Sequence, residues 1–155
     1  MEGDVVSEVR SRIMAAVRRT DTKPEKIVRS VLHRMGLRFR LHQRGLPGTP
    51  DVVLPRHRTV IFVHGCFWHR HDCSKATVPK TRREFWNSKF DANQARDARA
   101  CRELRDQGWR VLIVWECQTA NLAALRSQLR RAFKKRADSS SRGVRSCIVR
   151  SVARR

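Results

Sequence analysis

Long apolar segments are absent from this sequence. No run approaches the roughly 20 consecutive apolar residues of a membrane-spanning helix. The N-terminal segment MEGDVVSEVR also lacks the apolar core of a secretory signal peptide. We therefore expect a cytoplasmic protein with no membrane partner. The five cysteines are an odd number, and in a reducing compartment they favour metal ligands or buried thiols over a disulfide framework.

Acidic residues are scarce as well. The 155 residues include 35 Lys and Arg against 14 Asp and Glu, a formal net charge of +21, while 40% are hydrophobic, enough to build a folded core. Neutralising phosphates releases condensed counterions, so this charge favours a nucleic-acid partner over a merely soluble surface of mixed charge. We expect a monomer with one domain at 1–136, including a basic arm or helix at 1–20, and a disordered basic tail at 137–155.

Hydrophobic periodicity predicts a mixed α/β fold. The expected elements are a helix at 22–35 opened by a capping box, strands at 37–42, 51–54 and 59–63, a helix at 83–107, a strand at 110–116 and a helix at 121–136. The two strands around the long helix form a βαβ unit, so they should lie parallel with their carboxyl ends at one edge of the sheet. The strands at 51–54 and 59–63 form a hairpin in this scheme.

The loop VHGCFWHRHDC at 63–73 is dense in side chains that bind metals. Its cysteines and one histidine offer three ligands of the types that zinc prefers. Cys117 directly follows the second parallel strand and should emerge at the same edge, whereas Cys101 lies inside the long helix and Cys147 in the tail. The sequence thus predicts a structural zinc site formed by Cys66, His71, Cys73 and Cys117. The alternative is a buried thiol at Cys117 with solvent-facing loop histidines.

A second centre is predicted beside this loop. The hairpin register places Asp51 next to Phe62 and Val63, and a carboxylate there is a suitable ligand for Mg²⁺. Such an arrangement is common in restriction-endonuclease-like nucleases, although a Pro-Asp pair by itself more often just begins a strand. His64 and His69 are close enough to take a proton from water or to orient a phosphate.

Two further acidic residues are left open by their spacing. Glu25 either only closes the capping box of its helix or supports His64. Asp97 either is a solvated helical charge paired with a nearby base or supports His69. The sequence spacing does not choose between these alternatives.

Four segments resemble the very short patch repair (Vsr) endonucleases: LPGTPDVV, VIFVHGCFWHRHDC, VPKTRREFWNSKF and RDQGWRVLIVWEC. The similarity extends from Ser11 to Phe133. It implies a restriction-endonuclease-like fold, a structural zinc ion and a Mg²⁺-dependent nick on the 5′ side of the thymine in a T:G mismatch. Such mismatches arise when 5-methylcytosine deaminates. The expected partners are therefore mismatched duplex DNA and, functionally, a cytosine-5 methyltransferase and mismatch-repair proteins at the bacterial nucleoid.

The resemblance also implies roles for individual residues. Asp51 and the backbone carbonyl of Val63 would hold Mg²⁺, and the four zinc ligands are those named above. The catalytic residues would be His69 as the base that activates water, Asp97 as its support, and His64 with Glu25 as contacts of the scissile phosphate. The residues inserted into the base stack would be Phe67, Trp68 and Trp86. The sequence departs from the family at Val63, where threonine is usual, and at Arg70, which stands in a histidine-rich run.

Two alternatives remain at this point. The first is a non-catalytic nucleic-acid-binding module held together by zinc, in which Asp51 only caps a strand and the histidines contact phosphate. The second is a related nuclease with restriction specificity, because the same catalytic core serves either function.

Overall fold

The computed structural model describes residues 20–134, so all but the last residue of the predicted arm at 1–20, and the whole predicted tail at 137–155, lie outside the described residues. In chain order the elements are α2 (Lys23–Arg34), β1 (Arg40–Leu41), β2 (Val52–Leu54), η1 (Pro55–His57), β3 (Thr59–His64), α3 (Arg83–Asp106), β4 (Arg110–Trp115), η2 (Glu116–Ala120) and α4 (Leu122–Lys134). Within 20–134, no helix combines the length and apolar character needed to cross a bilayer.

The strands form a four-stranded mixed sheet in the order β1-β2-β3-β4. The pairs β1–β2 and β2–β3 are antiparallel, and β3–β4 is parallel, as the βαβ pattern predicts. Leu54 pairs with Thr59 and Val52 with Ile61, which is the predicted hairpin register. The hairpin turn is a single 3₁₀ turn that ends at Arg58 in the left-handed conformation, with φ of 48°.

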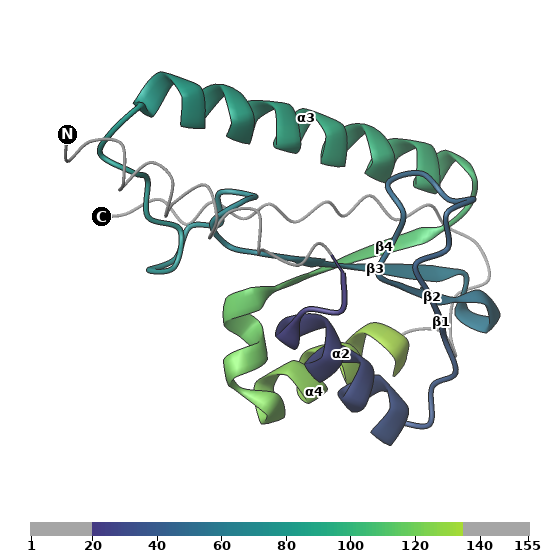
Figure 1. Ribbon diagram of the computed structural model, residues 1–155. Helices are drawn as coiled ribbons and strands as arrows, with labels where there is room; N and C mark the ends of the chain where they lie inside the picture. Colours follow the sequence, from purple (N-terminus) through teal and green to yellow (C-terminus); the bar gives the residue numbers. More distant parts are fainter. Residues whose placement is uncertain (1–19, 135–155) are drawn as a thin grey trace.

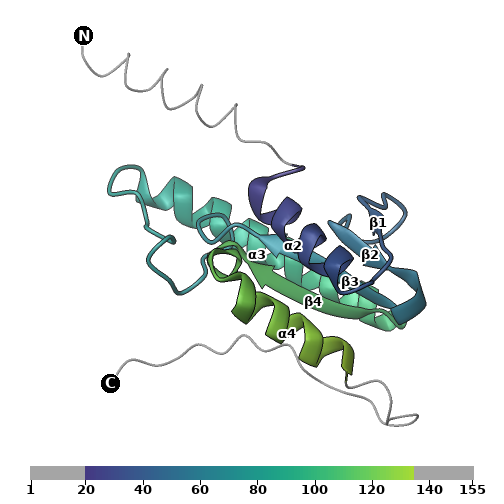
Figure 2. The ribbon, with the colours of Figure 1, turned by 90° about the horizontal axis from the view of Figure 1, so that it is seen from below.

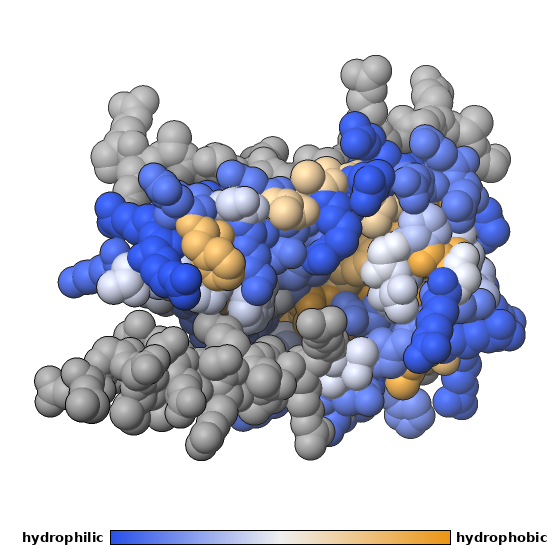
Figure 3. Space-filling model, turned by 45° about the horizontal axis from the view of Figure 1, so that its top comes forward, coloured by the Kyte–Doolittle hydropathy of each residue, from blue (hydrophilic) through white to orange (hydrophobic). Residues whose placement is uncertain are grey.

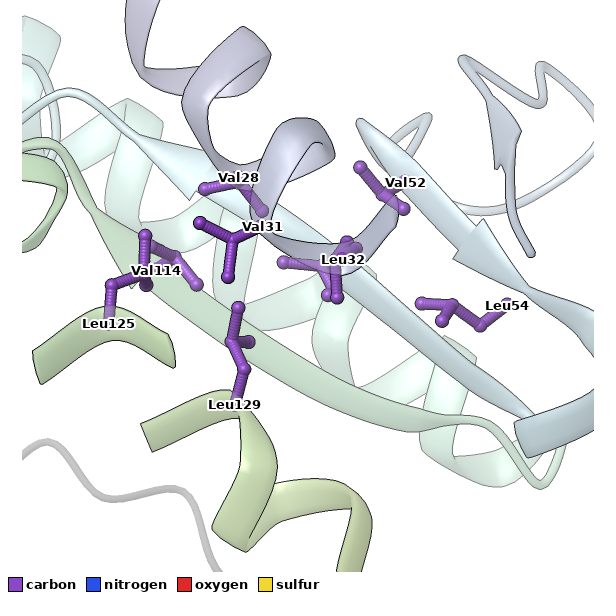
Figure 4. Packing of buried hydrophobic residues seen from close by; sticks show 9 residues of the cluster. Val28, Val31, Leu32, Val52, Leu54, Val114, Leu125 and Leu129 are labelled. Atoms are coloured by element: carbon purple, nitrogen blue, oxygen red, sulfur yellow. The ribbon is translucent and has the colours of Figure 1, made fainter. Parts of the chain in front are cut away.

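Helices cover both faces of the sheet. The long helix α3 lies on one face, and α2 and α4 lie on the other (Figures 1 and 2). Because side chains alternate along a strand, each face of β3 contributes to a different core. The core under α2 and α4 contains these buried residues: Val28, Val31, Leu32, Val52, Leu54, Ile61, Val114, Leu125 and Leu129 (Figure 4). The core under α3 contains Val53, Val60, Phe62, Cys101 and Leu104.

The start of α2 has the predicted capping box. Thr22 accepts a hydrogen bond from the backbone N–H of Glu25, and the Glu25 side chain accepts from the backbone N–H of Thr22. Pro24 occupies the first turn, where its missing N–H is not needed. These interactions hold the first turn of α2, and with it Glu25, in a defined orientation.

Two predicted boundaries are wrong. The strand expected at 37–42 is reduced to Arg40–Leu41, because the preceding residues complete the end of α2. Leu37 donates its backbone N–H to the carbonyl of Leu32, and Gly36 has a φ of 76°. The strand expected to include Glu116 ends one residue earlier, where the chain enters the 3₁₀ helix η2, which was not predicted.

Candidate active site and metal centre

The carboxyl ends of β3 and β4 lie side by side at one edge of the sheet. Their register pairs His64 with Trp115, the last residue of each strand. The loop that contains Cys66 leaves from the first strand, and Cys117 follows two residues after the second. This parallel pairing brings together side chains that are about fifty residues apart in the sequence.

The four predicted zinc ligands meet at this edge. One donor atom from each of them lies within 4.8 Å of the others, in the group Cys66, His71, Cys73 and Cys117. The backbone supports the group, because the N–H of His71 donates to the carbonyl of Cys66 at 3.0 Å and that of Cys73 to the carbonyl of His71 at 2.9 Å. The N–H of Cys117 points at the sulfur of Cys66, 3.4 Å away.

The chemistry of this group fits a zinc ion. A tetrahedral site with Zn–S bonds of ~2.3 Å separates its sulfurs by about 3.8 Å, and the donors here all lie within 4.8 Å of one another, close enough to share one ion. Burial raises the pKa of the Cys66 thiol to about 12 and also raises the pKa of Cys117. Burial would raise the pKa of Cys73 as well, but hydrogen bonds, first among them that of the Lys75 backbone, hold it below its usual value. A bound cation would keep all three sulfurs ionised. Three cysteines and one histidine leave no open coordination position, which is the composition of a structural site.

Asp51 lies at the same edge, beside the end of β3. Its Oδ2 accepts a hydrogen bond from the backbone N–H of Val63 at 2.7 Å, the contact that the hairpin register predicts. Burial raises the pKa of Asp51 to about 6, and the Val63 hydrogen bond opposes this shift only in part. When a carboxylate is shielded from water, its ionised form is costly, and a bound cation stabilises that form.

His69 and Asp97 form a close pair across the edge. Nδ1 of His69 lies 2.5 Å from Oδ2 of Asp97, which comes from α3, and both side chains are mostly buried. Burial alone would raise the pKa of Asp97, but the hydrogen bond and charge of His69 hold that pKa below its usual value. An ionised Asp97 fixes the proton on Nδ1 of His69, so Nε2 is left to accept a proton.

His64 is stacked on His69. Their rings are nearly parallel, with an interplanar angle of 6° and centroids 3.9 Å apart. Burial lowers the pKa of His64 to about 3, and the neighbouring His69 adds to this effect. His64 is therefore a neutral imidazole at physiological pH. It can orient a ligand by one hydrogen bond but supplies no positive charge.

Trp115 joins the two groups and was not predicted from the sequence. Its ring stacks on His71 at 4.3 Å and meets the edge of His64 at 5.4 Å and that of His69 at 6.5 Å. The parallel register pairs Trp115 with His64, so the sequence pattern contained a signal that could have found it.

Glu25 lies in a separate group of titratable residues. Its carboxylate accepts from the Thr22 hydroxyl at 2.8 Å, the Asp21 backbone N–H at 2.9 Å and the Arg29 guanidinium at 2.9 Å. Among the described residues, Glu25 groups with Asp21 and His42 as a possible metal-binding set, while His64 belongs to another set. These contacts favour the capping role of Glu25 over a direct contact with His64.

Aromatic side chains gather beside the zinc loop. Phe67 makes edge-to-face contacts with Trp68 at 5.1 Å and Trp86 at 5.5 Å, and the half-buried indoles lie 6.2 Å apart. The ammonium of Lys89 lies 5.6 Å from the Trp68 ring and 6.0 Å from the Trp86 ring. The space-filling view shows a mainly hydrophilic surface with separate small hydrophobic areas (Figure 3). An aromatic group with cations around it suits stacking on nucleic-acid bases.

Residues 4–75 match the family model described as DNA mismatch endonuclease Vsr. A type II nicking enzyme of Xanthomonas oryzae pv. oryzae, V.XorIIP, is 52% identical over 123 residues, which cover 79% of this chain and 90% of that protein. The DNA mismatch endonuclease Vsr of Escherichia coli is 51% identical over 108 residues, covering 70% of this chain and 69% of that protein. The type II nicking enzyme V.NmeAIP of Neisseria meningitidis is 40% identical over 125 residues, covering 81% and 89%.

Proposed function

Because this chain belongs to the Vsr family of DNA mismatch endonucleases, we propose that it nicks one strand of duplex DNA on the 5′ side of the thymine in a T:G mismatch. The reaction is hydrolysis of one phosphodiester bond. The observation that supports this function best is the close His69–Asp97 pair at the same sheet edge as Asp51.

His69 is the proposed general base. With Nδ1–H donated to Asp97, its Nε2 accepts a proton from the attacking water as the new P–O bond forms and the old one breaks. Asp97 holds the ring in the correct tautomer and stabilises the positive charge that the ring gains. His64, neutral and stacked on His69, orients the scissile phosphate by a hydrogen bond. Glu25, held in the first turn of α2, is proposed to contact the same phosphate together with His64.

Asp51 and the backbone carbonyl of Val63 would hold Mg²⁺. The buried carboxylate of Asp51 at the end of β3 supports this role, because its ionised form lacks a cationic hydrogen-bond partner among the contacts described above. Bound Mg²⁺ supplies Lewis-acid stabilisation of the negative charge that develops on the phosphate.

Zinc would be held by the three cysteines and His71 of the four-donor group. Its proposed contribution is structural, because the ligand set is closed and ties the loop of β3 to the end of β4. The mixed sheet with helices on both faces is compatible with a restriction-endonuclease-like fold, which we propose for this domain.

The aromatic group would recognise the mismatch. Phe67, Trp68 and Trp86 lie together with Lys89 beside the proposed catalytic residues, and an inserted ring stacks on bases that have been separated. A wobble pair is easier to open than a matched pair, so insertion favours the mismatch. We propose that the protein acts as a monomer in the cytoplasm on deaminated 5-methylcytosine sites, alongside a cytosine-5 methyltransferase and mismatch-repair proteins.

A cleavage assay tests this proposal. The purified protein is incubated with Mg²⁺ and duplexes that are identical except for a T:G or a matched pair. The expected result is a single Mg²⁺-dependent nick 5′ of the mismatched thymine. Double-strand cleavage of the matched duplex would indicate restriction specificity, and binding without cleavage would indicate a non-catalytic module.

A further inference from the structure

The Arg29 guanidinium lies among three side chains that could together bind a metal ion. Nη1 of Arg29 donates to Asp21 at 2.5 Å, and Nη2 contacts both Glu25 at 2.9 Å and Nε2 of His42 at 2.9 Å. The Arg29 side chain is 13% exposed and that of Glu25 is 4% exposed. An ion pair this well buried is screened by water far less than a surface pair.

Without the arginine, the same donors have the spacing of a cation site. One donor atom from each of Asp21, Glu25 and His42 lies within 4.8 Å of the others. Nε2 of His42 is 3.6 Å from the Asp21 carboxylate and 3.8 Å from the Glu25 carboxylate. One imidazole and two carboxylates are ligands that divalent transition metals accept. Arg29 contacts all three donors, so the positive charge that the group requires is already present.

Arg29 also links two segments of the chain. It joins the first turn of α2, through Glu25, to the residue that follows β1, where His42 has a φ of 44°.

We infer that Arg29 is a built-in cation that takes the place of a divalent metal ion among Asp21, Glu25 and His42. Arg29 is thus a positioning residue, since it holds Glu25 and His42 in place and occupies the position that a divalent ion would take among the three donors. This inference does not rest on the proposed function.

The inference is tested by counting bound Mn²⁺ in the purified protein and in Arg29→Ala, by calorimetric titration and by electron paramagnetic resonance. Arg29→Ala should bind one more equivalent of Mn²⁺ than the unmodified protein, and Mn²⁺ should raise its melting temperature more. The Asp51, His69 and zinc groups are the same in both proteins, so the difference in stoichiometry isolates the Arg29 position.

Three control variants make the result specific. Arg34→Ala removes a positive charge from the exposed last turn of the same helix and should bind no extra Mn²⁺. Arg29→Lys keeps a cation at the position and should also bind none. The double variant Arg29→Ala with Asp21→Asn should lose the added equivalent, because one of the three donors is weakened.

An Arg29→Ala protein that is folded but binds the same number of Mn²⁺ ions as the unmodified protein would overturn the inference. Arg29→Met keeps most of the apolar stem and serves if the alanine variant does not fold. Recovery of the fold on addition of Mn²⁺ supports the inference, and a variant that stays unfolded with Mn²⁺ counts against it. An unmodified protein that never nicks T:G duplex would contradict only the proposed function, because the difference in bound Mn²⁺ does not depend on nicking.

Discussion

The two groups at the end of β3 differ in how they are assembled. The four-donor group draws three ligands from one loop and the fourth from the residue after η2 begins, and three of its donors are sulfur. The proposed catalytic group takes its side chains from four places: Asp51 just before β2, His64 at the end of β3, His69 in the following loop and Asp97 in α3. Its donors are oxygen and nitrogen. Soft sulfur ligands select zinc and hard oxygen ligands select magnesium, so adjacent sites can hold different metals.

The two groups should also contribute to different properties, the four-donor group to stability and the proposed catalytic group to the reaction rate. A closed zinc site contributes folding free energy, whereas an open carboxylate and a histidine pair leave room for water and phosphate. Removing a ligand of the first group should therefore affect the fold, and removing a residue of the second should affect the rate. The following variants test this separation, from the largest expected effect to the smallest.

Cys117→Ala should cause the largest change. Zinc binding in small structural sites contributes on the order of 10 kcal/mol, so losing one ligand should abolish cooperative thermal unfolding or lower the melting temperature severely. Circular dichroism with zinc analysis measures both. The matched control is Cys101→Ala, a buried thiol in the core under α3, which should keep its zinc and its cooperative transition. Equal damage in the two variants would remove the zinc explanation.

Asp51→Asn should leave the fold intact and stop nicking. Loss of the metal ligand removes several kcal/mol of charge stabilisation, a fall in rate of about 10³-fold or more. Binding to T:G duplex should change little, as a gel-shift titration would show. Asp106→Asn, an exposed carboxylate at the far end of α3, controls for the change in charge. Nicking at the unmodified rate would exclude Asp51 from the site.

The hairpin register and the parallel pairing could both be predicted because they follow from residue counting. Leu54 opposite Thr59 places Asp51 at Val63, and a βαβ unit places Cys117 beside the zinc loop. Whether Asp97 contacts His69 depends on how α3 is oriented about its own axis, and sequence spacing does not determine that orientation. The contact of Arg29 with His42 depends on side-chain rotamers and on a left-handed loop residue, so it could not be predicted, whereas the parallel register that pairs Trp115 with His64 could have placed Trp115 beside the site.

Asp97→Asn should give an intermediate effect. The amide can still accept from Nδ1 of His69, but it does not stabilise the imidazolium that forms during proton transfer. Groups that orient a catalytic histidine typically contribute about 10- to 100-fold, so single-turnover nicking should slow by that factor while the melting temperature stays close to normal. Asp91→Asn, an exposed acid on the same helix, is the control. A nicking rate equal to that of the control would show that His69 does not need Asp97 for catalysis.

Trp68→Ala tests a residue that lies within the zinc loop but is proposed to act on DNA. Stacking on one base is worth roughly 1–3 kcal/mol, so the preference for T:G over matched duplex should fall by about 10-fold or more in competition binding. The zinc content and melting temperature should be retained. If zinc is lost instead, the indole is part of the core around Phe67 and Gly65, and other rings such as Trp86 must recognise the mismatch.

Trp115→Leu should have the smallest effect and test the separation most directly, because this ring contacts both groups. It stacks on the zinc-loop residue His71 at 4.3 Å and meets the edge of His64 at 5.4 Å. Leucine keeps an apolar side chain at the end of β4 but cannot stack on an imidazole, so both histidines should gain freedom. An aromatic contact contributes roughly 0.5–1.5 kcal/mol beyond burial, which corresponds to a change of a few-fold in the nicking rate and a small fall in zinc affinity. If the ring only fills space, Trp115→Leu and Trp115→Phe should nick equally well. If the ring couples the groups, the phenylalanine variant should recover most of the rate, and the variant with the lower zinc affinity should also be the slower nuclease.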